Sequence, residues 1–208
     1  MKKITAEDFK TLWLSFIDEI IMIQNWKELW NSSGAWTRAT IGDAKSSEQL
    51  SPIGNYLKTK IPDLKYMNED AKFDLTATTG QFIKQIATIK GGDFSYYDST
   101  ESEFFPTIYD ILIEQENEIY TCWREIAKLA YTRSYLKVLI TFNSDNLSTE
   151  DLKMENEMVF KNAESIIEQC SNDFTESYQT EYLILIGNLT QDKIEWNSKT
   201  FSKMFFTA

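Results

Sequence analysis

The chain has 208 residues but no histidine, and its cysteines are limited to Cys122 and Cys170. Without histidine, a His-based catalytic triad and the usual His/Cys zinc sites are excluded. Any metal is therefore expected to be a hard cation held by carboxylates. Two cysteines, each within a helical pattern, do not make a disulfide framework, so we expect a reducing compartment.

Long apolar runs and linker sequences are also missing. The longest aliphatic run, 20–23, is far shorter than the ~20 residues that a membrane-spanning helix needs. The N-terminal segment turns acidic at Glu7 and Asp8 before any apolar stretch, which argues against a secretory signal. The 3 prolines and 7 glycines mark no linker or repeat. We therefore expect one domain over residues 1–208, located in the cytoplasm, with no membrane partner.

Positive charge is scarce, since 21 basic residues face 32 acidic ones and the formal net charge is −11. The imbalance grows along the chain, and residues 148–208 carry 11 acidic and 5 basic side chains. A strongly acidic chain lacks the usual electrostatic footprint of a nucleic-acid-binding protein. This composition favours a basic protein as partner.

The residue patterns predict an α/β fold, a mixed central sheet flanked by helices. A capping box at Thr5–Asp8 starts a long helix to about residue 30, with apolar residues recurring on one face. Residues 1–63 form a helical part, 64–142 the core, and 143–208 a C-terminal helix and strands, with 79–105 as an insertion. Within these parts the predicted helices are 53–61, 117–133 and 148–170, and the predicted strands are 64–67, 72–78, 107–116, 135–142, 181–186 and 193–201.

Acidic side chains gather on the polar faces of two predicted strands. Asp110, Glu114 and Glu116 share one strand face with Leu112, and the two glutamates have Cα atoms roughly 6.8 Å apart. Acids this close raise each other's pKa unless a cation lies between them. Asp74 lies on the polar face of the neighbouring strand, so Asp74 and Glu114 are the predicted clamp for Mg²⁺ or Mn²⁺. Glu116 is a second ligand or the base that orients water, and Asp110 is an alternative first ligand.

Together these residues resemble the motif of the PD-(D/E)XK nuclease superfamily of restriction and repair endonucleases. Phe73-Asp74 stands where that family has Pro-Asp, and 114–116 stands at its (D/E)XK, at the end of a strand and before a helix. The resemblance implies a restriction-endonuclease-like core and magnesium-dependent hydrolysis of DNA. Phe73 replaces the proline, Glu116 replaces the lysine, and the 39 residues between Asp74 and Glu114 are an unusually long gap.

The missing motif lysine has one candidate replacement, Lys128. Arg124 and Lys128 lie four residues apart on the following helix, so both project from one face. If that face turns toward the carboxylates, the pair could engage a scissile phosphate. Lys72 and Lys84 are the next nearest basic residues by sequence.

Two functions remain open at this point. One is a divalent-metal-dependent nuclease acting on DNA. The other is a non-enzymatic acidic interaction protein, either an inactive nuclease-like fold or an immunity or antitoxin-type protein that covers a basic partner. The aromatic residues Trp13, Phe16, Trp26 and Trp30 are expected in a core or a homo-oligomer interface rather than in a base-stacking platform.

Overall fold

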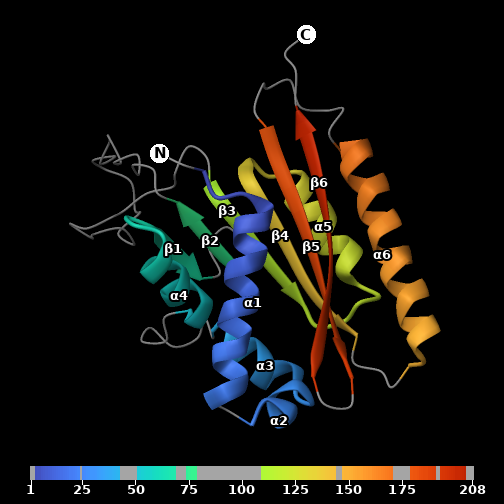
Figure 1. Ribbon diagram of the computed structural model, residues 1–208. Helices are drawn as coiled ribbons and strands as arrows, with labels where there is room; N and C mark the ends of the chain where they lie inside the picture. Colours follow the sequence, from blue (N-terminus) through green and yellow to red (C-terminus); the bar gives the residue numbers. More distant parts are fainter. Residues whose placement is uncertain are drawn as a thin grey trace, which may run out of the picture.

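The computed structural model describes residues 3–23, 25–42, 51–68, 74–78, 109–143, 147–170, 179–190 and 193–204. They form an α/β protein around a six-stranded mixed sheet whose strands lie side by side in chain order (Figure 1). The strands are β1 (Lys65–Asn68), β2 (Leu75–Thr78), β3 (Tyr109–Glu116), β4 (Ser134–Asn143), β5 (Gln179–Leu189) and β6 (Ile194–Met204). Strands β1, β2 and β3 pair antiparallel, β3, β4 and β5 pair parallel, and β6 returns antiparallel to β5.

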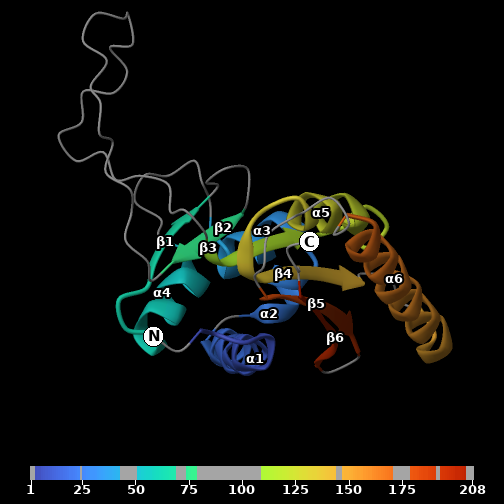
Figure 2. The same ribbon diagram turned by 90° about the horizontal axis from the view of Figure 1, so that it is seen from above.

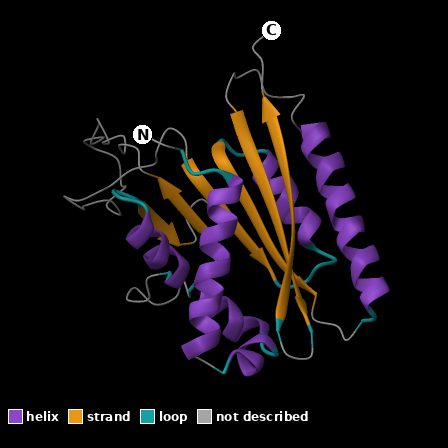
Figure 3. Cartoon of the chain, viewed as in Figure 1, coloured by secondary structure: helices purple, strands orange, loops and turns teal. Residues whose placement is uncertain are grey.

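Helices cover both faces of the sheet (Figure 2). They are α1 (Ala6–Ile23), α2 (Trp26–Trp30), α3 (Ser33–Thr40), α4 (Pro52–Lys60), α5 (Cys122–Ala130) and α6 (Thr149–Cys170). Helices α5 and α6 connect β3 to β4 and β4 to β5, because parallel neighbours need a crossover connection. They lie on the face opposite α1, so the sheet is the middle layer of the molecule (Figure 3).

Each face of the sheet has its own hydrophobic core. Strand residues such as Ile113 and Val138 pack toward α1, where Trp13 is fully buried. On the other face Leu112 and Leu139 pack against α5 and α6. The strand face that carries Glu114 is therefore covered by helices instead of facing solvent.

The helix predicted over residues 5–30 is two helices in the structure. Between them Asn25 has φ −72° and ψ 75°, outside the helical region. The break lets Trp30 pack on the sheet, where its ring centroid lies 4.9 Å from that of Phe142 and 5.0 Å from that of Trp36. Helix α3, which carries Trp36, was not predicted.

The other predicted elements with described residues are present, with shifted ends. Helix α5 starts at Cys122 instead of Asn117, because a turn with a hydrogen bond from the Glu118 amide to the Glu116 carboxylate (3.1 Å) comes first. Cys122 and Cys170 are both buried and free, so neither forms a disulfide. Within the described ranges, no helix is long and apolar enough to cross a membrane. The predicted insertion 79–105, together with Lys72, Phe73 and Lys84, lies outside the described residues.

Candidate functional site

Strand pairing brings Asp74 beside Glu114. Asp74 directly precedes β2, and the antiparallel register with β3 sets Leu75 opposite Ile113. One residue further, the same register sets Asp74 across from Glu114. The Oδ2 atom of Asp74 accepts a hydrogen bond of 2.6 Å from the amide of Gln115, which fixes the two strands at this point. Two acids that are 40 positions apart in the chain are thus neighbours in the sheet.

Helix α5 closes over Glu114 and supplies a cation to it. The Glu114 side chain is almost fully buried, and Lys128 Nζ lies 2.6 Å from its Oε1. The same ammonium lies 2.6 Å from Glu125 Oε2. Glu114 and Glu125 therefore share one positive charge, and Asp74 beside Glu114 adds a further negative charge when it is ionised.

Burial and the neighbouring charges shift the pKa values of Glu114 and Lys128. Burial first, and then the neighbouring Asp74, raise the pKa of Glu114 to about 9, although Lys128 lowers it. Burial lowers the pKa of Lys128, but its hydrogen bonds and charge interactions with Glu114 and Glu125 outweigh that effect and raise it. Burial and Asp74 thus disfavour the ionised form of Glu114, whereas Lys128 or an added cation favours it.

Helix α3 clamps the strand from the opposite face through Gln115. The Gln115 side chain accepts a hydrogen bond from Thr40 Oγ1 at 2.9 Å, and its Nε2 donates to Thr37 Oγ1 at 3.0 Å. Asn117 Nδ2 also donates to Thr37 Oγ1, at 3.1 Å. Sequence reasoning missed these positioning residues. The available signal was Gln115 itself, a polar residue on the face that Ile111 and Ile113 bury in the core.

The two other predicted acids are placed differently. Glu116 lies one pleat beyond Glu114, is half-buried and accepts a hydrogen bond from the Glu118 amide. It lines a cavity of about 530 Å³ at the carboxyl ends of β3 and β4. Asp110 lies four residues before Glu114, roughly 13 Å along the strand, so the structure does not bring it to the pair.

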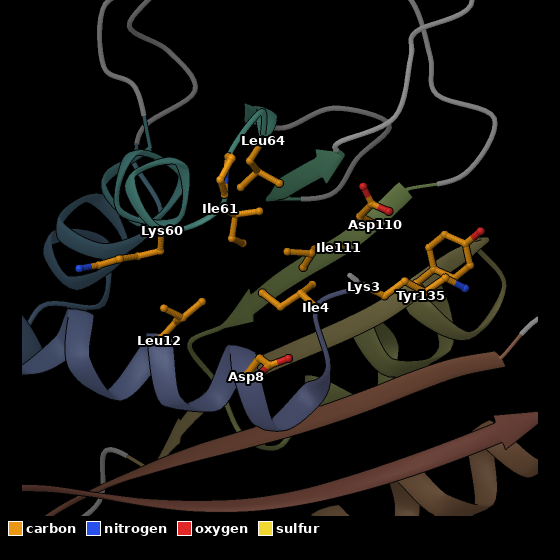
Figure 4. A pocket seen from close by; sticks show the side chains of 11 residues that line it. Lys3, Ile4, Asp8, Leu12, Lys60, Ile61, Leu64, Asp110, Ile111 and Tyr135 are labelled. Atoms are coloured by element: carbon orange, nitrogen blue, oxygen red, sulfur yellow. The ribbon is translucent and has the colours of Figure 1, made fainter. Parts of the chain in front are cut away.

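Asp110 belongs to a different cavity, of about 460 Å³, between the start of α1, the end of α4 and the start of β3 (Figure 4). Thr78 donates a hydrogen bond of 3.3 Å to the Asp110 carboxylate. Lys3, Lys60 and Asp8 contribute the other charged side chains to the lining. This cavity is separate from the Asp74–Glu114 pair.

The two basic residues predicted to act together on α5 have different surroundings in the structure. Lys128 reaches Glu114, whereas Arg124 is exposed with its guanidinium 5.4 Å from the ring of Trp123. Among the residues that the structure describes, no three or more acidic or cysteine side chains are grouped to hold a metal ion. A cation at Asp74 and Glu114 would therefore have two carboxylate ligands.

Comparison with models of protein families, with curated proteins and with solved structures found no match to this chain.

Proposed function

We propose that this chain is a divalent-metal-dependent nuclease that hydrolyses DNA phosphodiester bonds at the Asp74–Glu114 pair. The observation that supports it best is the approach of these two acids on adjacent strands, with Lys128 from the crossover helix on Glu114. An acid before one strand and a second near the end of its neighbour, followed by a helix and another strand, is the order that the resemblance to PD-(D/E)XK nucleases implies.

The donor set suits a hard cation. Mg²⁺ is often held by one or two protein carboxylates, with water in several of its remaining positions, and Asp74 and Glu114 would supply two. Asp74 lies beside Glu114, and the Lys128 ammonium is already shared between Glu114 and Glu125, so a further cation at the Asp74–Glu114 pair is favoured. When bound, Mg²⁺ or Mn²⁺ supplies an activated water and stabilises negative charge on the phosphate oxygens.

The surrounding residues have separate roles in this proposal. Lys128 stands in for the motif lysine by holding the Glu114 carboxylate and presenting positive charge to the scissile phosphate. Glu116, half-buried and one pleat away, orients water as a general base. Gln115 keeps the strand in register, since its amide holds Asp74 and its side chain holds α3.

Cleavage of supercoiled plasmid tests the proposal. Purified protein should nick DNA with Mg²⁺ or Mn²⁺ and not with EDTA. Glu114→Gln and Asp74→Asn should each lower the rate by about 100-fold or more, because the amides keep the shape but lose the charge that holds the cation. Asp18→Asn, an exposed acid on α1, is the matched control and should retain full activity.

If the folded wild-type protein cleaved neither single- nor double-stranded DNA, this result would contradict the proposed nuclease activity. The second candidate is then an inactive nuclease-like fold that acts by binding a basic partner. The near-complete burial of Glu114, at 2% exposed, and its closure by Lys128 favour this candidate, because the acid already has a cationic partner within the chain.

A further inference from the structure

Four large apolar side chains are exposed together where α5 meets α6. They are Tyr120, Trp123, Met154 and Met158, with 49–60% of each exposed, and we call them the α5/α6 patch. Tyr120, Trp123 and Met158 line a small hollow between the two helices, and Met154 lies one turn before Met158 on α6. Contiguous exposed apolar side chains of this kind mark interaction sites, whereas isolated ones do not.

The patch is held in a fixed arrangement by contacts beneath it. The Tyr120 hydroxyl donates a hydrogen bond of 2.8 Å to Glu155, which also accepts one of 2.6 Å from Asn143 at the end of β4. Buried Ile126 and Val159 join α5 to α6 below the hollow. A surface that is already ordered loses less conformational entropy when a partner binds.

The charges on the α6 side of the patch are mostly acidic, and Arg124 on α5 lies 5.4 Å from the Trp123 ring. Three of the four residues that neighbour Met154 at helical spacing are Glu150, Asp151 and Glu157, and the fourth is Met158. Helix α6 as a whole carries six acidic residues and two lysines. A second copy of the chain would bring two acidic α6 helices together, and like charges across an interface are unfavourable. The occupant must therefore supply positive charge.

We propose that the α5/α6 patch binds an amphipathic helix of a basic partner protein. The apolar face of that helix covers the Trp123, Met154 and Met158 side chains, and its lysines or arginines face the acids of α6. Methionine adapts its shape to different apolar surfaces, and aromatic residues and methionine are enriched in interface cores. A helix lying in an apolar groove is a recurrent mode of recognition. This site is independent of the carboxylate pair.

Calorimetric titration with two synthetic peptides tests the charge requirement. A 14-residue helical peptide of leucine and lysine should bind one per chain, with an affinity that falls as salt rises. A peptide with the same leucine pattern but glutamate for lysine should not bind. Binding of both peptides, or of neither, would overturn the proposal.

Substitutions in the patch test its location. Trp123→Ser combined with Met158→Ser should lower the affinity for the leucine–lysine peptide at least tenfold. Met22 on α1 is 83% exposed and lies outside the patch, so Met22→Ser is the matched control. This variant should bind the leucine–lysine peptide as tightly as wild type does. Because all three side chains are exposed, circular dichroism should show that each variant keeps the fold. Equal binding by the double variant and the control would show attraction to acidic surface alone and would overturn the proposal. The proposal would also be overturned if the wild type were a dimer and the double variant a monomer, since the occupant of the patch would then be a second copy of the chain.

Discussion

Two lysines on the α5/α6 side of the sheet show how burial changes the pKa of an ammonium group, one with neighbouring carboxyl groups and one without. Lys128 contacts Glu114 and Glu125, and its pKa is raised. Lys137 on β4 is 1% exposed, and its Nζ donates to the Tyr182 hydroxyl at 3.0 Å and the Ala130 carbonyl at 3.4 Å. These neutral partners do not replace hydration of the charge, and burial lowers the pKa of Lys137 to about 7.

Lys137 should therefore make stability depend on pH. The pKa of Lys137 is about 7 in the folded chain and 10.5 in the unfolded chain. Between pH 7 and pH 10.5 the unfolded chain therefore binds more protons than the folded one. The cost of the buried ammonium is full below pH 7 and disappears as pH rises toward 10.5. Lys137→Met should raise the free energy of unfolding by about 2–4 kcal/mol at pH 6 and by clearly less at pH 9.

Urea denaturation of wild type and Lys137→Met at both pH values measures this difference. Comparing the two proteins at each pH removes the contribution of the other titrating groups. An equal stability difference at pH 6 and pH 9 would show that Lys137 keeps its proton in the fold.

At the scale of the element, local patterns predicted most of the sheet and the helices flanking it. Alternating residues marked β3, and α6 starts at Thr149 beside the predicted residue 148, where the Asp151 amide donates to Ser148 Oγ at 3.2 Å. The break at Asn25 and the whole of α3 could not be predicted in this way. Both depend on Trp30 and Trp36 packing against Phe142, more than 100 residues away in the chain.

The candidate site also has one part that local sequence patterns predict and another part that they do not. Alternation on β3 and the polar face of the neighbouring strand were enough to suggest Asp74 with Glu114, because strand periodicity is local. Burial of Glu114 depends on how α5 crosses the sheet, and the clamp on Gln115 depends on α3. Gln115 is a polar residue on an apolar strand face, which indicates a buried polar partner, but no local pattern identifies α3 as that partner or shows how α5 crosses the sheet.

Gly187 on β5 lies where α2 packs closely on the sheet. A Cβ atom there would lie 2.9 Å from Trp30, 3.1 Å from Phe142 and 3.2 Å from Trp196. Gly187→Ala should lower the free energy of unfolding by about 1–3 kcal/mol, because the packed rings must shift. Gly34→Ala on α3 is the matched control, since the added Cβ meets only the end of the Arg38 side chain at 3.3 Å.

Thermal or urea unfolding of the two glycine variants distinguishes packing from helix propensity. Gly34→Ala should be neutral or stabilising by up to about 1 kcal/mol, because alanine favours a helix over glycine. If Gly187→Ala were as stable as wild type, the packing of α2 on β5 described above would be incorrect.

At the scale of the whole molecule, α5 joins the two proposed sites. Its inner side carries Lys128 to the Asp74–Glu114 pair, and its outer side presents Trp123 in the α5/α6 patch. The net charge of −11 weakens attraction to DNA, since phosphate neutralisation supplies much of DNA affinity. The same charge favours the basic partner proposed for the patch.

The proposed nuclease requires that Asp74 and Glu114 hold a divalent cation together. Calorimetric titration of Mn²⁺ into the purified protein measures this directly, without requiring DNA. We expect one saturable site per chain that is lost in Glu114→Gln and in Asp74→Asn and retained in Asp110→Asn. Absence of binding by the wild type, or equal binding by all four proteins, would contradict it.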